Sequence, residues 1–236
     1  MKSDKSRKAS DSLAEGAVGS GGKMATEKPR GTTTRNPKRT HAAILDAATD
    51  EFASHGLSGA RVDSIAARAK ANKRMLYHYF GDKEALYLAV LESTYASIRT
   101  AEKSLDLAHR DPQEGIRELA LFTWHYFLDH PEFFSLLMTE NLHEARYLKR
   151  SKKITAMHSH LIVELSDVLK RGERQKLFKP GLDPVKVYLT IASIGFFYLS
   201  NRHTLSTIFE RDLTEPEALK AWGEHIVSVT LASIRV

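Results

Sequence analysis

The placement of proline constrains the fold of this chain more than any other feature of its sequence. Asn36-Pro37, Asp111-Pro112 and Asp183-Pro184 each join a side chain that caps helix N-termini to a proline, and proline is favoured at the first helical position. Pro131 and Pro216 also open strongly helical stretches, so five of the seven prolines predict helix starts. Since no run of alternating apolar and polar residues is long enough to indicate a sheet, the sequence predicts an all-α fold.

Periodic apolar residues between these starts predict about nine helices. Gly56, Gly81 and Gly172 each follow such a segment, and we expect them to end helices because glycine is favoured just past a helix C-terminus. The expected helices span residues 37–55, 61–69, 73–80, 83 to about 104, 112–129, 131–143, 150–171, 184–203 and 215–234.

The positive charge of the chain is concentrated at its N-terminal end. The net charge is +6, and the first 40 residues already hold 10 Lys/Arg against 4 Asp/Glu. Residues 1–36 are rich in Gly, Ser and Thr, and Leu13 and Val18 are their only Leu, Ile or Val. Such a segment buries too little apolar surface to offset its ordering entropy. We therefore expect 1–36 to be a disordered basic arm, either a nucleic-acid arm or a solvated tail.

Several classes of protein are excluded or disfavoured by composition. The absence of cysteine excludes disulfides, thiolate zinc sites, iron–sulfur clusters and cysteine nucleophiles. There is no phosphate-cradling Gly-rich loop and no nucleophile elbow, so we predict no enzyme and no cofactor. The longest uncharged run, Val187–Asn201, is shorter than the roughly 20 residues that span a bilayer. No apolar stretch follows the N-terminal lysines, and we expect a soluble, cytoplasmic protein without a membrane partner.

Residues 61–83 carry the clearest functional signal. They predict a short helix, a tight turn at Lys70-Ala71-Asn72 and a second short helix, which together form a helix-turn-helix motif at about 61–80. Helical spacing turns Leu76 and Phe80 of the second helix toward a small core.

The opposite face of this second helix holds Lys73, Arg74, Tyr77 and His78. Arginine can donate two hydrogen bonds to a guanine edge, and lysine can reach base edges or phosphates. Tyr77 can donate to a phosphate, and Lys83 lies where the free N–H groups of the next helix also favour an anion. The alternative is that these are ordinary solvated charges on a surface helix.

Here the residues resemble a known family. The stretch from Arg39 to Leu91 resembles the DNA-binding domain of TetR-family transcriptional regulators, through ILDAA at 44–48, EF at 51–52, Gly56, IA at 65–66, LYHYF at 76–80 and DKEAL at 82–86. The resemblance implies a DNA-binding domain at 37–91, followed by a helical ligand-binding and dimerisation domain at 92–236. The stretches 130–148 and 197–209 resemble that second domain more weakly.

The resemblance also implies roles for individual residues. Bases are expected to meet Lys73, Arg74, Met75 and His78, whereas phosphates are expected to meet Tyr77, Lys83 and the region near Arg61. The chain departs from the family at two positions, where Lys70 stands in place of the usual glycine and Asn72 in place of the usual serine cap. Asn caps equally well, but Lys70 is expected to adopt a positive φ at a cost of about 1 kcal/mol.

The C-terminal part is expected to bind a small, largely apolar inducer, because its interior is rich in aromatic residues and poor in polar groups. The candidate ligand-binding residues are Trp124, His125, Phe134, Met138, Asn141, Tyr147 and Phe197. The alternative for each aromatic is that it simply fills a core.

The resemblance implies a homodimer formed through the helices at 184–203 and 215–234. Val187–Asn201 is apolar around its whole circumference, so this helix should be covered on more than one side. Gly195, in its middle, is expected to let another backbone approach closely. The alternative is a central core helix in a monomer.

The sequence therefore predicts a transcriptional regulator, most simply a repressor, that binds a palindromic DNA operator as a dimer and is released by a small molecule. The alternative from another class is a helical enzyme or metal-binding protein that uses the eleven histidines. The pairs His158/His160 and His125/His130 do not have the i, i+4 spacing of helical metal ligands, so no metal site is predicted. A third hypothesis is a ligand-binding adaptor that has lost DNA binding. The basic face of the second short helix argues against it.

Overall fold

The computed structural model describes residues 36–236, except for the side chains of His158 and Ser159. The predicted basic arm lies outside the described residues, apart from Asn36. Within the described range the chain forms nine α-helices, two 3₁₀ turns and no strand beyond one isolated bridge between Phe178 and Arg235. The all-α prediction is confirmed. The α-helices are α1 Pro37–Gly59, α2 Val62–Arg68, α3 Lys73–Phe80, α4 Lys83–Glu102, α5 Pro112–Asp129, α6 Pro131–Leu142, α7 Lys152–Arg174, α8 Pro184–Ile208 and α9 Pro216–Ile234.

The five prolines occupy the start of α1, α5, α6, α8 and α9, as predicted. The side chains of Asn36, Asp111 and Asp183 accept hydrogen bonds from backbone N–H groups of the first turns of their helices. Gly56 and Gly81 have φ values of 63° and 85°, which favour glycine, and they kink α1 and end α3 respectively.

The expectation that Gly172 ends a helix is wrong, because α7 continues to Arg174. A Cβ at this position would collide with the ring of Phe178. Gly172 is therefore needed for the close approach of that ring, and the chain instead turns at Lys176, which has a φ of 57°.

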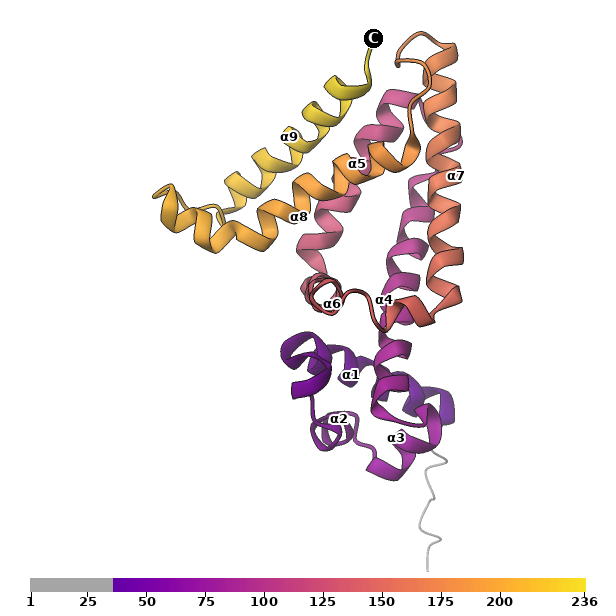
Figure 1. The fold of residues 1–236 in the computed structure, drawn as a ribbon, viewed down its shortest axis with the longest axis vertical. Helices are drawn as coiled ribbons and strands as arrows, with labels where there is room; N and C mark the ends of the chain where they lie inside the picture. The colour runs from indigo at the N-terminus through magenta and orange to yellow at the C-terminus, as the bar shows by residue number, and fades with distance from the viewer. Residues whose placement is uncertain (1–35) are drawn as a thin grey trace, which may run out of the picture. The chain divides into compact units, whose positions relative to one another are not determined.

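Two hydrophobic clusters organise the helices, and α4 runs through both. The first surrounds Phe52, Leu76 and Leu86 and includes Leu136 of α6 and Ile154 of α7. The second contains Ile98 of α4 together with the buried faces of α5, α7, α8 and α9. Figure 1 shows α4 rising from the α1–α3 group to lie along α7, while α8 and α9 lie together beside α5.

Candidate nucleic-acid interface

The turn between α2 and α3 has the backbone geometry expected of a helix-turn-helix motif. Lys70 adopts a φ of 51°, as predicted for the position that usually holds glycine. The N–H of Ala71 donates to the carbonyl of Ala66 at 2.9 Å, and the N–H of Lys70 to that of Ala67 at 3.1 Å. This pair of hydrogen bonds is the Schellman arrangement, which ends α2 sharply and directs the chain into α3.

Contacts at both ends hold α3 in place. The side chain of Asn72 accepts a hydrogen bond from the N–H of Met75 at 2.8 Å, so the predicted cap is present. Leu76 is fully buried beside Ile65 in the first hydrophobic cluster. At the far end, the ring of His41 lies 4.6 Å from the ring of Phe80. One face of α3 is thus fixed in the core, which leaves the other face for a partner.

The outward face of α3 presents the side chains that the sequence predicted. Lys73, Arg74, Tyr77 and His78 are exposed, with Tyr77 43% exposed. Met75, also predicted to reach bases, is half-buried at the edge of this face. The face therefore combines two cations, a phenol and an imidazole within two turns of one helix.

Some of the positive charge around α3 is already paired. The Nζ atom of Lys73 lies 2.8 Å from Oδ1 of Asp63, and the hydrogen bond and charge of this carboxylate raise the pKa of Lys73. Arg68 is paired with Asp50 in the same way. Arg61 and Arg74 have no ion-pair partner among residues 36–236, so they are the arginines of this motif most available to an anion.

The predicted phosphate contacts Lys83 and Arg61 lie at helix starts. The Nζ atom of Lys83 is 3.4 Å from the carbonyl oxygen of Ser58, and the side chain is half-buried. The carboxylate of Asp82 accepts the N–H of Ala85 at 2.7 Å, so this N–H is not available to a phosphate. The N–H of Arg61 donates to the buried Glu51 at 2.9 Å, which joins the start of α2 to α1 and leaves the guanidinium exposed.

Two further cations near this surface were missed by sequence reasoning. Lys38 and Arg39 are exposed in the first turn of α1, which holds no acidic residue. Cations at a helix N-terminus oppose the helix dipole, so they do not stabilise α1 itself. His41, one turn on, contacts both Tyr79 and Phe80 and so places this end of α1 beside the end of α3. The signal was present in the sequence as a basic pair directly after the Asn36-Pro37 helix start.

The C-terminal helices line a cavity of about 420 Å³ that lies between α4, α5, α6 and α8 and is open to the surface at Leu189, which is 56% exposed. Asn141 is the only candidate ligand-binding residue in its lining, and its amide donates to the carbonyl of Leu137 at 2.8 Å. The lining comprises Tyr95, Arg99, Phe127, Phe133, Leu137, Asn141, Tyr188, Leu189, Ala192, Ser193 and Phe196.

The other six predicted ligand residues lie elsewhere. Trp124 is buried, and its indole N–H donates to the carbonyl of Leu219 at 3.1 Å. Tyr147 packs on Tyr87 in the first hydrophobic cluster. Phe134 is not part of the lining, and its ring lies 4.9 Å from that of Phe196. The remaining three are exposed: His125 and Met138 outside this cavity and Phe197 beside a second hollow between α8 and α9.

The described residues offer no support for a metal centre or a membrane span. Among residues 36–236, no group of three His, Asp or Glu side chains is arranged to hold a metal ion. None of the helices in the same range combines the length and the apolar character that crossing a bilayer requires.

Comparisons with known proteins agree with this geometry. The family model for bacterial regulatory proteins of the tetR family matches residues 44–90, and the model for a tetracyclin repressor-like C-terminal domain matches residues 112–230. The transcriptional repressor NicS of Pseudomonas putida is 39% identical over 212 residues, which cover 90% of this chain and all of NicS. The transcriptional repressor SCO4008 of Streptomyces coelicolor is 42% identical over 113 residues, covering 46% of this chain and 53% of that protein.

Solved structures show the same fold. The structure of SCO4942 from Streptomyces coelicolor, described as a transcriptional regulator, has a TM-score of 0.61 at 26% identity and covers 83% of this chain and 98% of its own. A protein from Mesorhizobium loti has a TM-score of 0.62 at 23% identity, with 86% of this chain and 100% of that chain covered. The helix-turn-helix geometry and these relatives define a DNA-binding transcriptional regulator, and the family to which they point is a family of regulators and not an enzyme family. The chain belongs to the tetR family, whose regulators bind DNA and respond to small molecules.

Proposed function

We propose that this chain represses transcription as a homodimer bound to a palindromic operator, and that a small molecule bound in its C-terminal helices releases it. The observation that carries the proposal is the outward face of α3, where Arg74 is exposed without an ion-pair partner among the described residues. Relatives that are named transcriptional repressors support the direction of regulation.

In this proposal residues 37–91 form the DNA-binding domain and residues 92–236 the ligand-binding and dimerisation domain. Arg74 reads a base edge, assisted by Lys73, Met75 and His78. Tyr77, Lys83 and Arg61 hold phosphates on either side of α3, because contacts of this kind fix the position of a recognition helix without reading sequence.

The operator can be identified by selecting bound duplexes from a random pool with the purified full chain. A selected site with two inverted halves, bound in a salt-dependent way, is the expected result. Arg74→Ala should weaken binding by about 1–3 kcal/mol and relax preference at one base pair per half-site. The matched control is Arg174→Ala, since Arg174 is exposed at the end of α7. Unchanged base preference in Arg74→Ala would refute the assigned role.

The proposed dimer forms through α8 and α9. Val187, Ile191 and Tyr198 of α8 are buried within the chain, whereas Leu189 and Phe197 on its other face are 56% and 60% exposed. Large apolar side chains exposed along one helix face are typical of an interface between subunits.

One expectation about this interface needs correction. Gly195 faces its own chain, since a Cβ there would lie 3.3 Å from the ring of Trp124 and 3.7 Å from Ile226. It therefore permits packing of α8 on α5 and α9 within the chain, and the partner is expected on the face of Leu189 and Phe197.

The interface is tested by Leu189→Asp and Phe197→Asp, with Val163→Asp as the control. Val163 lies on α7 and is 58% exposed, an exposed fraction close to those of the two test residues. A carboxylate buried without a partner strongly destabilises an interface, so light scattering should give monomers for the two α8 variants and a dimer for the control. Dimers in all three variants would show that the interface does not lie on this face of α8.

A further inference from the structure

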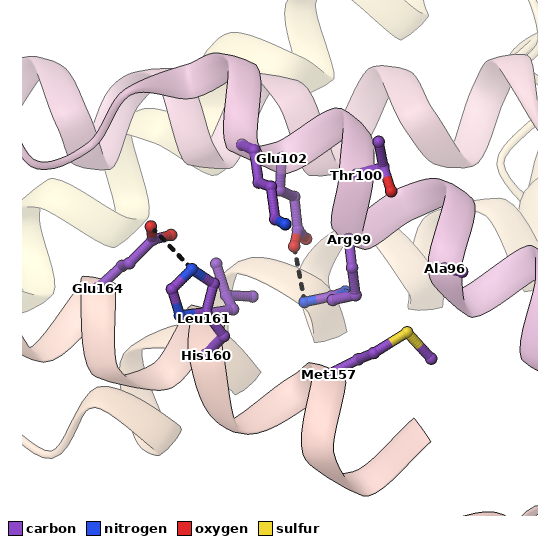
Figure 2. A pocket seen from close by; sticks show the side chains of 9 residues that line it. Ala96, Arg99, Thr100, Glu102, Met157, His160, Leu161 and Glu164 are labelled. Carbon is purple, nitrogen blue, oxygen red and sulfur yellow. Dashed lines mark ion pairs between the residues drawn. The ribbon is translucent and has the colours of Figure 1, made fainter. Parts of the chain in front are cut away.

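Arg99, on the inner side of α4, is a buried cation with unused hydrogen-bonding capacity. Its side chain is 8% exposed, and its Nη1 atom lies 2.8 Å from Oε2 of Glu102, one turn along the helix (Figure 2). The contact joins the two charges without an aligned hydrogen bond. The guanidinium of Arg99 also makes a side-chain hydrogen bond with the hydroxyl of Tyr188, whereas Nε and Nη1 of Arg99 and Oε1 of Glu102 have no hydrogen-bond partner among the described residues. Such groups are normally satisfied when they are buried.

Arg99 is also the one residue that two neighbouring cavities share. On one side lies the hollow of about 240 Å³ drawn in Figure 2, where Glu102 and the His160–Glu164 pair are found. On the other side lies the 420 Å³ cavity between α4, α5, α6 and α8. Arg99 is the only charged residue in the lining of this second cavity, whose walls include Tyr95, Phe127, Phe133, Tyr188 and Phe196.

The charge of Arg99 is incompletely balanced from within the protein. Burial raises the pKa of Glu102 to about 7, against the lowering effect of Arg99 and with a further rise from Glu164. Near neutral pH a large share of the molecules therefore carries a protonated Glu102 beside a guanidinium that stays charged. Such a buried ion pair is a poor source of stability, because the desolvation cost of two charges can exceed what an unaligned contact returns, and the hydrogen bond with Tyr188 leaves Nε and Nη1 of Arg99 unsatisfied.

We propose that Arg99 binds the carboxylate of a small acid whose apolar body fills the aromatic cavity between α4, α5, α6 and α8. This assignment rests on the proposed function, in which a small molecule binds the C-terminal helices, and it specifies the chemical class of that molecule. A carboxylate matches the planar donor fork of a guanidinium, and a cavity of this size accommodates a compact ligand. Neutral apolar molecules would leave the donors of Arg99 unsatisfied and are expected to bind less well.

The test compares acids with their amides, which share a shape but not a charge. Benzoate, 3-phenylpropanoate and octanoate, each beside its amide, are titrated into the purified full-length chain by isothermal calorimetry. At least one acid should bind about tenfold or more tightly than its amide, as expected for a charge-assisted hydrogen bond. Equal binding of acid and amide would overturn the proposal, and so would the absence of binding by all three acids up to about 10 mM, beyond which an affinity is too weak for a specific site.

A variant tests whether Arg99 is the group responsible. The double variant Arg99→Gln/Glu102→Gln removes both charges together, which avoids leaving one of them buried alone. It should lose the preference for acid over amide, whereas Arg174→Gln, on the exposed end of α7, should retain it. An unchanged preference in the double variant would place the carboxylate elsewhere. The acid–amide comparison in the unaltered protein stands even if the double variant does not fold.

The outcome is separable from that of the proposed function because no DNA is present in the calorimetric assay. Operator binding by a protein that ignores all three acids would refute the ligand class alone. Acid binding that leaves operator affinity unchanged would refute release by a small molecule and leave the Arg99 site intact.

Discussion

The ion pair between Asp63 and Lys73 should limit how strongly the recognition helix holds DNA. Nζ of Lys73 lies 2.8 Å and 3.0 Å from the two oxygens of Asp63, and both side chains are at least half exposed. An exposed pair of this kind contributes little to stability because solvent screens it, so a phosphate can compete with the carboxylate for the lysine. Asp63→Asn should therefore free Lys73 and raise the affinity for any duplex.

The magnitude follows from counterion release. Each phosphate neutralised by a cation adds about 0.9 to the slope of log affinity against log salt. In the Asp63→Asn background, Lys73→Met should reduce this slope by about 0.9, which corresponds to about a 3.5-fold smaller loss of affinity for each fourfold rise in salt. With Asp63 present, Lys73→Met should reduce the slope by less, because the lysine is then shared between Asp63 and DNA.

The measurement is fluorescence anisotropy with a labelled duplex of arbitrary sequence, between about 50 and 200 mM salt. Asp167→Asn is the control, since Asp167 is exposed on α7 and the variant changes net charge equally. Asp63→Asn also removes an acidic residue from the first turn of α2, so its unfolding in urea should show a loss of up to about 1 kcal/mol. An unchanged slope on adding Lys73→Met to Asp63→Asn would show that Lys73 does not bind phosphate.

Three further predictions concern stability. Lys70→Ile should lose about 1–2 kcal/mol in urea unfolding, because a β-branched residue would take the φ of 51°, whereas Lys70→Gly should stay within about 1 kcal/mol of the unaltered chain. Gly223→Ala should cost about 1–3 kcal/mol, since its Cβ would lie 2.9 Å from the ring of Trp124, and an unchanged midpoint would contradict this packing. Glu102 has a pKa of about 7 in the fold against an ordinary value of 4.5 for glutamate, so the folded state holds its proton to higher pH. The free energy of unfolding of the unaltered chain, measured relative to that of Glu102→Gln, should therefore fall by up to about 3 kcal/mol as pH rises from about 4.5 to 7. A difference between the two proteins that does not change with pH would contradict the raised pKa.

Helix starts were predictable because their signals are local. An Asn or Asp cap and the proline that follows it act within one turn, and the starts of α1, α5 and α8 fall where these dipeptides place them. Helix ends depend more on tertiary contacts. Gly172 reads as a C-terminal signal in the sequence, but the ring of Phe178 occupies the space beside it and α7 continues.

The recognition face was predictable for the same local reason, since helical periodicity alone assigns Leu76 to the core and Arg74 to the surface. The C-terminal cavity was not predictable residue by residue. Trp124 faces Gly195 and Gly223 in the core instead of the cavity, and no spacing rule distinguishes these surroundings. Nothing in the i, i+3 spacing of Arg99 and Glu102 indicates burial, and only the packing of other helices over α4 buries them.

The contacts around Glu140 show how the cavity and the recognition helix can influence one another. Glu140 is buried on α6, next to the cavity residue Asn141, and its Oε2 atom accepts the N–H groups of Tyr147 and Leu148 at 3.2 Å and 2.9 Å.

The ring of Tyr147 in turn packs 5.3 Å from that of Tyr87 on α4, whose pKa is raised by burial and by the charge of Glu140. The carboxylate of Glu140 already interacts with the hydroxyl of Tyr87, through hydrogen bonding as well as charge, but within the described residues the hydroxyl and Oε1 of Glu140 make no well-aligned hydrogen bond. Because a poorly aligned contact between buried polar groups is costly, a small movement of α6 that aligned the two groups would favour a second arrangement of α4. A ligand that binds the two arrangements unequally would then shift the start of α4, where Lys83 lies. This shift would change the distance between the two recognition helices of a dimer, which a palindromic operator requires to be fixed.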